Sequence, residues 1–160
     1  ARFLSMMTKE IRNHEKNCKK HNLKPVIRLN TTSDIMWENH KIMELFPGVI
    51  FYDYTKHFKR MLKYLRGELP KNYHLTFSRN EANDKETMEV LRHGGNVSIV
   101  FRGKLPEIYN GYKVINGDLH DLRFTDPKNV IVGLKEKPFL NPETNKKEID
   151  QSGFVIDLNK

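Results

Sequence analysis

The chain has one cysteine and no long apolar run, and each shortage excludes a class of protein. A single thiol, Cys18, cannot form an internal disulfide or an all-cysteine metal cage, so we interpret it as a small apolar helix residue. No apolar run approaches the roughly 20 residues of a membrane-spanning helix, and we expect no membrane partner. The first twenty residues are charged throughout, unlike a secretory signal peptide.

Common cofactor and phosphate-binding motifs are also missing. The sequence contains no Walker loop, no G-x-G-x-x-G fingerprint and no H-E-x-x-H zinc motif. Its strands do not carry the clustered aromatic residues of an RNA-recognition or cold-shock sheet. We therefore predict no cofactor, and any ligand must be recognised by individual polar side chains.

Positive charge is abundant and unevenly distributed. The 160 residues carry a net charge of +8, with 38% hydrophobic and 30% charged residues, which is typical of one globular domain. Residues 1–30 hold eight Lys and Arg against two Glu, and residues 55–72 hold six against one. Two basic segments on an otherwise neutral body indicate a surface that faces a polyanion, although solvated helix faces have the same composition.

Alternating strand and helix patterns define the architecture. Short apolar runs recur about 24 residues apart, each followed by a helical pattern, which predicts parallel βα units with right-handed crossovers. The four predicted strands cover residues 25–30, 49–52, 73–77 and 97–101. We predict a single α/β domain over 1–160, built as a partial barrel or an open twisted sheet with a mixed C-terminal part.

The same patterns set the boundaries within this domain. A basic helix is predicted over 3–20 from one apolar stripe: Leu4, Met7, Ile11, His14 and Cys18. Four βα units follow over about 25–104, with Ser33 or Asp34 capping a second helix that runs to Phe46. The part from 105 to 160 is irregular, with strands at 112–115, 129–134 and 154–156 and an exposed excursion at 138–152.

Each of the four strands ends in a polar cluster, and the carboxyl ends of parallel strands are where such folds bind ligands. We expect these side chains to surround one concavity, with arginine and lysine holding phosphate and asparagine orienting it. Helix caps and ion pairs are the structural alternative. The predicted ligand-binding residues are Arg28, Asn30, Asp34, Tyr54, Lys56, Arg79, Asn80, Arg102 and Lys104.

A second cluster follows Gly117 and is the only one in the sequence suited to acid/base or metal chemistry. Its candidate catalytic residues are Asp118, His120 and Asp121, with the imidazole as a base that an aspartate orients or the three as metal ligands. Their spacing matches no standard metal motif, and aspartates are also common turn residues. We therefore expect no bound metal.

Several segments together resemble a group of uncharacterised phage and prophage proteins. The resemblance rests on residues 27–30, 33–34, 51–56, 75–81, 111–118, 121–124, 130–135 and 152–155. It implies a viral or mobile-element origin, a location in the cytoplasm of a host cell and a truncated barrel of the radical-enzyme type. Many members of the group carry an upstream cysteine-rich segment that this sequence does not contain, so no cluster-dependent chemistry is implied.

Three functions are compatible with these patterns. The leading hypothesis is a phage-type protein that binds a phosphate-bearing ligand, nucleic acid or nucleotide, at the strand ends. The first alternative is a metal-dependent or acid/base enzyme at the same face. The second is a structural or interaction protein whose polar strand ends only cap helices. The oligomeric state is left open.

Overall fold

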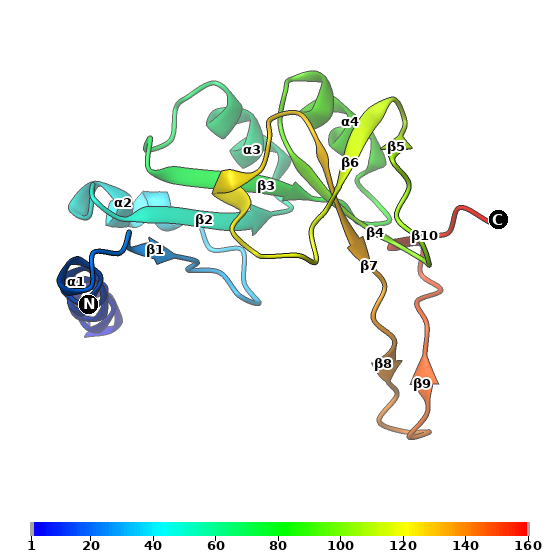
Figure 1. The fold of residues 1–160 in the computed structure, drawn as a ribbon, viewed down its shortest axis with the longest axis horizontal. Helices are drawn as coiled ribbons and strands as arrows, with labels where there is room; N and C mark the ends of the chain where they lie inside the picture. Colours follow the sequence, from blue (N-terminus) through cyan, green and yellow to red (C-terminus); the bar gives the residue numbers. More distant parts are fainter. Residues whose placement is uncertain (1, 160) are drawn as a thin grey trace.

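A computed structural model describes residues 2–159 and shows an eight-stranded, mainly parallel sheet with helices packed against it (Figure 1). The strands lie in the order β1-β2-β3-β4-β7-β6-β5, with β10 added beside β4. The predicted α/β fold is confirmed. Of the two arrangements left open, the order is that of an open sheet, because β1 and β5 do not pair with each other.

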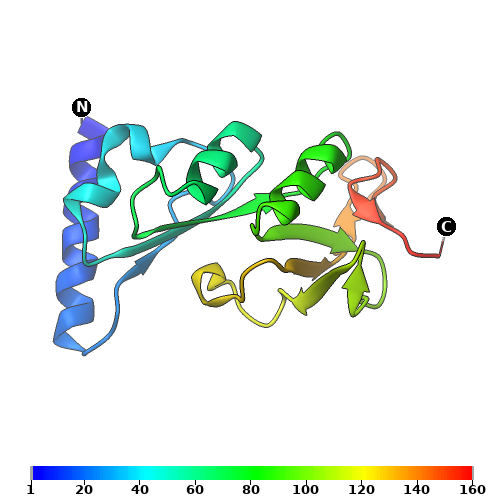
Figure 2. The same ribbon diagram turned by 90° about the horizontal axis from the view of Figure 1, so that it is seen from above.

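The first four strands are consecutive and parallel. They are β1 (Val26–Ile27), β2 (Ile50–Thr55), β3 (Tyr73–Ser78) and β4 (Val97–Phe101). Helices α3 (Phe58–Leu65) and α4 (Asp84–Arg92) cover one face of this sheet, and the segment between β6 and β7 lies on the other (Figure 2). Helix α1 (Arg2–Lys20) runs along the β1 side.

Alternation along the strands separates an apolar face from a polar one. Phe51, Phe77 and Ile99 belong to the core that α3 and α4 cover. The neighbouring positions therefore point to the opposite face, because successive strand side chains alternate. These positions include Tyr54, Ser78 and Ser98, so the second face is lined with hydroxyl groups.

The C-terminal part completes the sheet and adds a projecting arm. Strand β7 (Ile131–Lys135) pairs with β4 and β6 (Tyr112–Asn116), which pairs in antiparallel fashion with β5 (Ile108–Tyr109). A hairpin of β8 (Phe139–Leu140) and β9 (Lys147–Glu148) extends away from the body (Figure 1). Strand β10 (Val155–Ile156) returns beside β4.

The predicted helix from Ser33 or Asp34 to Phe46 is wrong. The chain instead forms a short 3₁₀ helix, Trp37–His40, and then α2 (Ile42–Leu45). Lys41 separates them in the left-handed conformation, with φ 55°, which interrupts a continuous helix. The Asp34 carboxylate does not cap a helix that follows it. It accepts hydrogen bonds from the Thr55 hydroxyl and the Lys56 backbone N–H, where β2 leads into α3.

The first strand is shorter than predicted. It pairs with β2 only at Val26 and Ile27, because the next polar groups leave the sheet. The backbone N–H of Asn30 donates to the carboxylate of Asp53 at 2.8 Å instead of to a neighbouring strand.

Among residues 2–159, no helix is long and apolar enough to cross a bilayer.

Candidate functional site

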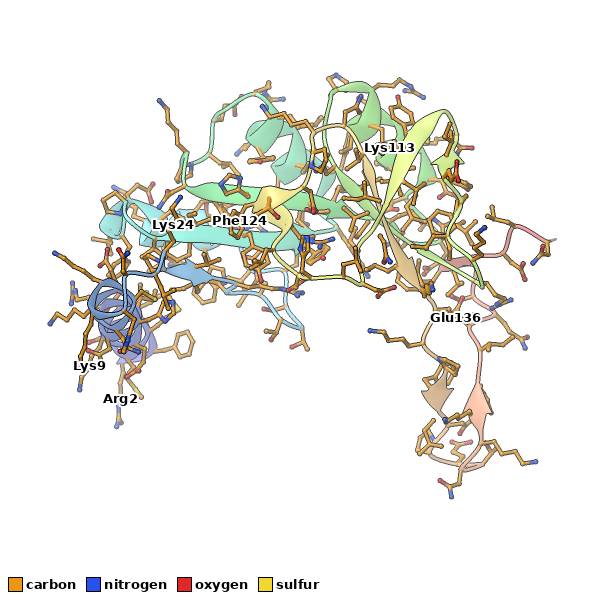
Figure 3. All side chains as sticks on the ribbon, viewed as in Figure 1. Arg2, Lys9, Lys24, Lys113, Phe124 and Glu136 are labelled. Atoms are coloured by element: carbon orange, nitrogen blue, oxygen red, sulfur yellow. The ribbon has the colours of Figure 1, made fainter. Side chains whose placement is uncertain are left out.

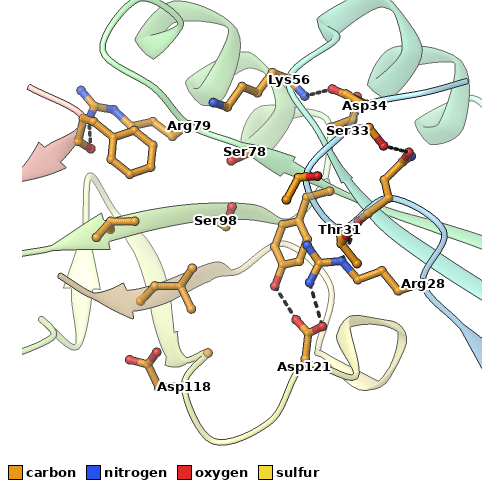
Figure 4. A pocket seen from close by; sticks show the side chains of 18 of the residues that line it. Arg28, Thr31, Ser33, Asp34, Lys56, Ser78, Arg79, Ser98, Asp118 and Asp121 are labelled. Carbon is orange, nitrogen blue, oxygen red and sulfur yellow. Dashed lines mark hydrogen bonds and ion pairs between the residues drawn. The ribbon is translucent and has the colours of Figure 1, made fainter. Parts of the chain in front are cut away.

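A pocket of about 650 Å³ lies on the polar face of the sheet, where the carboxyl ends of β2, β3 and β4 meet the segment after β6. In Figure 4, Ser78 and Ser98 lie between Lys56 and Arg79 on one side and Asp118 and Asp121 on the other. The pocket therefore brings hydroxyl groups, cations and carboxylates into one concavity. Its size suits a small organic ligand rather than a single ion.

Nine of the predicted binding or catalytic residues line this pocket. Two of them, Asn30 and Arg79, are almost completely buried. The other seven are Arg28, Asp34, Tyr54, Lys56, Asp118, His120 and Asp121. Sequence reasoning placed the first four on strand ends and the last three in a separate cluster. The tertiary structure joins both groups, because the segment after β6 folds back over β2 and β3.

One side of the pocket is held together by Asp121. Its carboxylate pairs with the guanidinium of Arg28 at 2.9 Å and accepts hydrogen bonds from the hydroxyls of Tyr52 and Tyr54 at 3.1 and 3.2 Å. Arg28 also lies over the Tyr54 ring, 4.7 Å from its centroid. Asp121 thereby ties the segment after β6 to β1 and β2.

Burial changes the acidity of these tyrosines. Desolvation raises the pKa of Tyr54 well above its ordinary value, with Arg123 opposing the shift and Asp121 reinforcing it. The pKa of Tyr52 is raised mainly by burial and then by the Asp121 carboxylate. Both phenols therefore keep their protons at neutral pH and act as hydrogen-bond donors to Asp121.

Asn30 is an anchor for its loop. Its side-chain carbonyl accepts hydrogen bonds from Ser33, the Ile35 amide and the Trp37 indole, all within 3.1 Å. Its amide nitrogen donates to the carboxylate of Asp53 at 3.1 Å. With only 2% of its surface exposed, Asn30 shapes the wall formed by residues 31–34 and leaves little polar surface for a ligand.

Asp34 belongs to a network centred on Arg60, under the helix-covered face. Arg60 donates to Asp34 and to both carboxylate oxygens of Glu38 at 2.8 Å, and to the Tyr73 hydroxyl at 2.6 Å. Tyr73 in turn donates to Asp53 at 2.7 Å. Burial raises the pKa of Asp53 to about 6, against the lowering effect of the Tyr73 hydrogen bond.

Arg79 is one of the predicted phosphate-binding residues, but its nitrogens already have protein partners. It forms a two-point pair with Asp84, at 2.7 and 3.2 Å, and donates to the carbonyls of Gly153 and Phe154 at 2.5 and 2.7 Å. These contacts fill the gap between the end of β3 and β10. Arg79 therefore joins the two segments and is only 6% exposed.

Asn80, Arg102 and Lys104 lie outside the pocket. Asn80 forms a local turn, accepting a hydrogen bond from the Ala82 amide at 2.9 Å. Arg102 pairs with Glu136 and Asp157 at 2.8 and 3.0 Å and lies beside Lys104 at a smaller hollow. The expected convergence fails here because β10 occupies the edge of β4 beyond Val100, which separates the end of β4 from that of β3.

The candidate catalytic residues line the pocket but hold separate partners. Asp118 accepts a hydrogen bond from the Lys135 amide at 2.9 Å, whereas Asp121 is engaged as described above. His120 Nδ1 lies 3.2 Å from a nitrogen of Arg123, and it must accept there because arginine can only donate. Within residues 2–159, no three His, Cys, Asp or Glu side chains are grouped so that they could hold a metal ion.

Several lining residues were not among the predicted binding residues. Ser98 could have been found from strand alternation, since it pairs in register with Ser78 on β3. Lys137 and Phe154 come from the C-terminal part, and no local pattern in the sequence points to them. Phe154 closes one end of the pocket, where the Lys56 ammonium lies 5.8 Å from its ring centroid.

Comparison with known proteins supplies the family. The family model described as Gene product 88 matches residues 1–158. The chain belongs to the Gene product 88 family. The resemblance to a phage-type family is thereby confirmed, whereas the radical-enzyme type of barrel receives no support. No curated protein and no solved structure matches the chain, so the function of this Gene product 88 member has to be argued from its site.

Proposed function

We propose that this Gene product 88 protein binds a small phosphate-bearing ligand of mononucleotide size in the polar-face pocket. The proposal rests on which cations of the pocket already form ion pairs with carboxylates of the protein. Arg28 and Arg79 are engaged by carboxylates, whereas Lys56 and Lys137 form no ion pair within 4.0 Å with any residue from 2 to 159. Two ammonium groups are thus available to an anion in the same concavity.

The surrounding groups suit the remainder of such a ligand. Thr31, Thr32, Ser78 and Ser98 offer hydroxyls that can donate to phosphate oxygens or bond to a sugar. Phe154 supplies an apolar ring beside Lys56, against which a flat base could pack. A volume of about 650 Å³ lies within the usual range for small-molecule sites.

Catalysis at the same pocket is the alternative. It would use Asp118, His120 and Asp121 as acid/base groups, an assignment that stays a prediction. The geometry favours binding over this alternative on two counts: Asp121 already accepts three hydrogen bonds, and His120 Nδ1 accepts from Arg123. A base needs a free acceptor within reach of the proton that it removes.

Calorimetric titration with the common ribonucleoside 5′-monophosphates and with inorganic phosphate tests the proposal. We expect saturable binding of at least one nucleotide, and we expect Lys56→Ala or Lys137→Ala to weaken it about tenfold or more, because each removes a charge-assisted contact. The matched control is Lys59→Ala, which removes an exposed lysine of α3 outside the pocket and should leave the affinity unchanged.

Two results would contradict the proposal. One is the absence of binding by every nucleotide at millimolar concentration. The other is an equal loss of affinity in Lys56→Ala and Lys59→Ala, since general electrostatic attraction would then explain the binding without the pocket.

A further inference from the structure

Helix α1 carries a continuous stripe of cations that the pocket does not use. Its members are spaced by three, four or seven residues, which places them on one face of the helix. We call them the α1 stripe: Arg2, Lys9, Arg12, Lys16, Lys19 and Lys20. All six are exposed, and Figure 3 shows Arg2 and Lys9 extending from α1 away from the sheet.

The opposite face of α1 fastens the helix to the body. Ile11 and Cys18 are buried, and Leu4 and Met7 pack against the core. Most of the apolar side of the helix is therefore covered by protein, and its exposed apolar residues are limited to Phe3 and Met6 near the start. A helix that lies in a membrane surface needs its apolar side free for the lipid, so this arrangement disfavours a bilayer as the partner.

The α1 stripe is not neutralised by the described part of the chain. None of its six cations forms an ion pair within 4.0 Å with a residue between 2 and 159, and Arg12 only stacks over the Phe46 ring at 5.8 Å. Of the two acidic residues of the helix, Glu10 lies outside the three- and four-residue spacing of the stripe. Glu15 is three residues from Arg12 and four from Lys19, but it forms no ion pair within 4.0 Å with either. The positive charge is thus presented to solvent.

We propose that the α1 stripe docks the phosphate backbone of duplex nucleic acid without reading its sequence, as a surface separate from the pocket. The 19 residues of α1 extend over about 28 Å at 1.5 Å per residue. A duplex carries one charge per about 1.7 Å of its axis, so a straight row of this length can meet several phosphates at once. Flexible lysines suit such backbone contacts, which position a protein without specifying bases.

Fluorescence anisotropy with a labelled DNA duplex of about 20 base pairs tests the proposal. Binding should weaken steeply between about 50 and 200 mM salt, because each phosphate contact releases counterions. The triple variant Lys9→Gln/Lys16→Gln/Lys19→Gln should bind at least about tenfold more weakly at 50 mM salt. Its salt slope should be shallower by about 2 to 3, close to 0.9 per cation removed.

A second triple variant provides the matched control. Lys59→Gln/Lys63→Gln/Lys71→Gln removes the same charge from exposed positions on and after α3, and it should change the affinity by less than about twofold. Equal losses in the two triple variants would overturn the proposal, as would the absence of duplex binding at 50 mM salt. Binding to phosphatidylserine vesicles without binding to DNA would also overturn it.

Two further variants test whether a loss of binding comes from misfolding or from the pocket instead of from the α1 stripe. Replacing Lys9, Lys16 and Lys19 together by arginine keeps the charge and should keep the affinity, with unchanged helicity by circular dichroism. Lys56→Ala should leave duplex binding intact, because Lys56 belongs to the pocket and not to the α1 stripe. A loss in Lys56→Ala equal to that of the glutamine triple would contradict a separate docking surface.

Discussion

Arg60 and Arg28 both pair with aspartate, yet they lie on opposite faces of the sheet in very different surroundings. The Arg60 side chain is 2% exposed and donates to two carboxylates and a phenol, while its partner Asp34 is held by the β2–α3 connection. The Arg28 side chain is 28% exposed and its partner Asp121 is 50% exposed. The Arg60 guanidinium is enclosed by protein even though Asp34 reaches the pocket, whereas both partners of the second pair are open to the cavity.

This difference indicates which polar residues hold the fold and which can meet a ligand. A buried charge that loses its partner is strongly unfavourable, so the network around Arg60 has to stay complete. A half-exposed pair is screened by water and contributes little stability, so Arg28 and Asp121 can exchange partners at small cost. Asn30 and Arg79 were predicted to bind a ligand, but both are almost completely buried and hydrogen-bonded to protein groups. They therefore belong to the residues that hold the fold.

Arg123 is as buried as Arg60, but its hydrogen bonding is incomplete. It is 4% exposed, with Nε 3.3 Å from a carboxylate oxygen of Asp126, but Nε and Nη1 have no hydrogen-bond partner in the part of the chain that the structure describes. The residue supports the segment that carries His120. Burial also raises the pKa of Asp126, and Arg123 opposes that shift.

Removing Arg60 should have the largest effect on stability. Arg60→Met leaves the carboxylates of Asp34 and Glu38 without their cation, and we expect the free energy of unfolding to fall by about 3–5 kcal/mol. Urea denaturation measures it. The control is Arg66→Met, whose pair with Glu68 is exposed and should leave the unfolding curve unchanged. Equal effects of the two substitutions would show that burial does not distinguish these networks.

The buried network should also reveal itself through pH. The pKa of Asp53 is about 6 in the folded protein and 3.8 as its ordinary value. Between these values the folded state holds a proton that the unfolded chain has lost, so the free energy of unfolding falls as pH rises from about 4 to 6. The shift corresponds to at most about 3 kcal/mol.

Asp53→Asn isolates this contribution. The other carboxylates titrate in both proteins, so the difference between their unfolding free energies, measured by urea denaturation at a series of pH values, reports Asp53 alone. The difference should vary between about pH 4 and 6 and level off on either side. A difference that stays constant through this window would contradict a raised pKa.

The smallest effect on stability is expected for the half-exposed pair of Arg28 and Asp121. Asp121→Asn weakens the pair with Arg28, and we expect at most about 1 kcal/mol of lost stability because the pair is half exposed. Amides of residues 117–125 should nevertheless exchange hydrogen faster, since Asp121 ties this segment to β1 and β2. Asp118→Asn is the control, and equal acceleration in both variants would remove the special role of Asp121.

Local sequence patterns determined most of the architecture. The helix over α1, the strands β2, β3, β4, β6 and β7, and the helices α3 and α4 follow from apolar periodicity and from glycine and proline boundaries, because these signals act within a few residues. The location of a ligand face at strand ends followed from parallel βα topology. The basic character of α1 could likewise be read directly from its spacing.

Which polar side chains face the pocket depends on packing between segments that are distant in the sequence. Arg79 and Arg102 both follow a strand end, but β10 pairs with β4 and separates them. Arg79 joins β3 to the returning C-terminal segment, whereas Arg102 pairs with Glu136 outside the pocket. Lys137 and Phe154 reach the pocket because segments distant in sequence pack together. Whether an arginine is free or engaged depends on such long-range partners, and local periodicity carries no information about them.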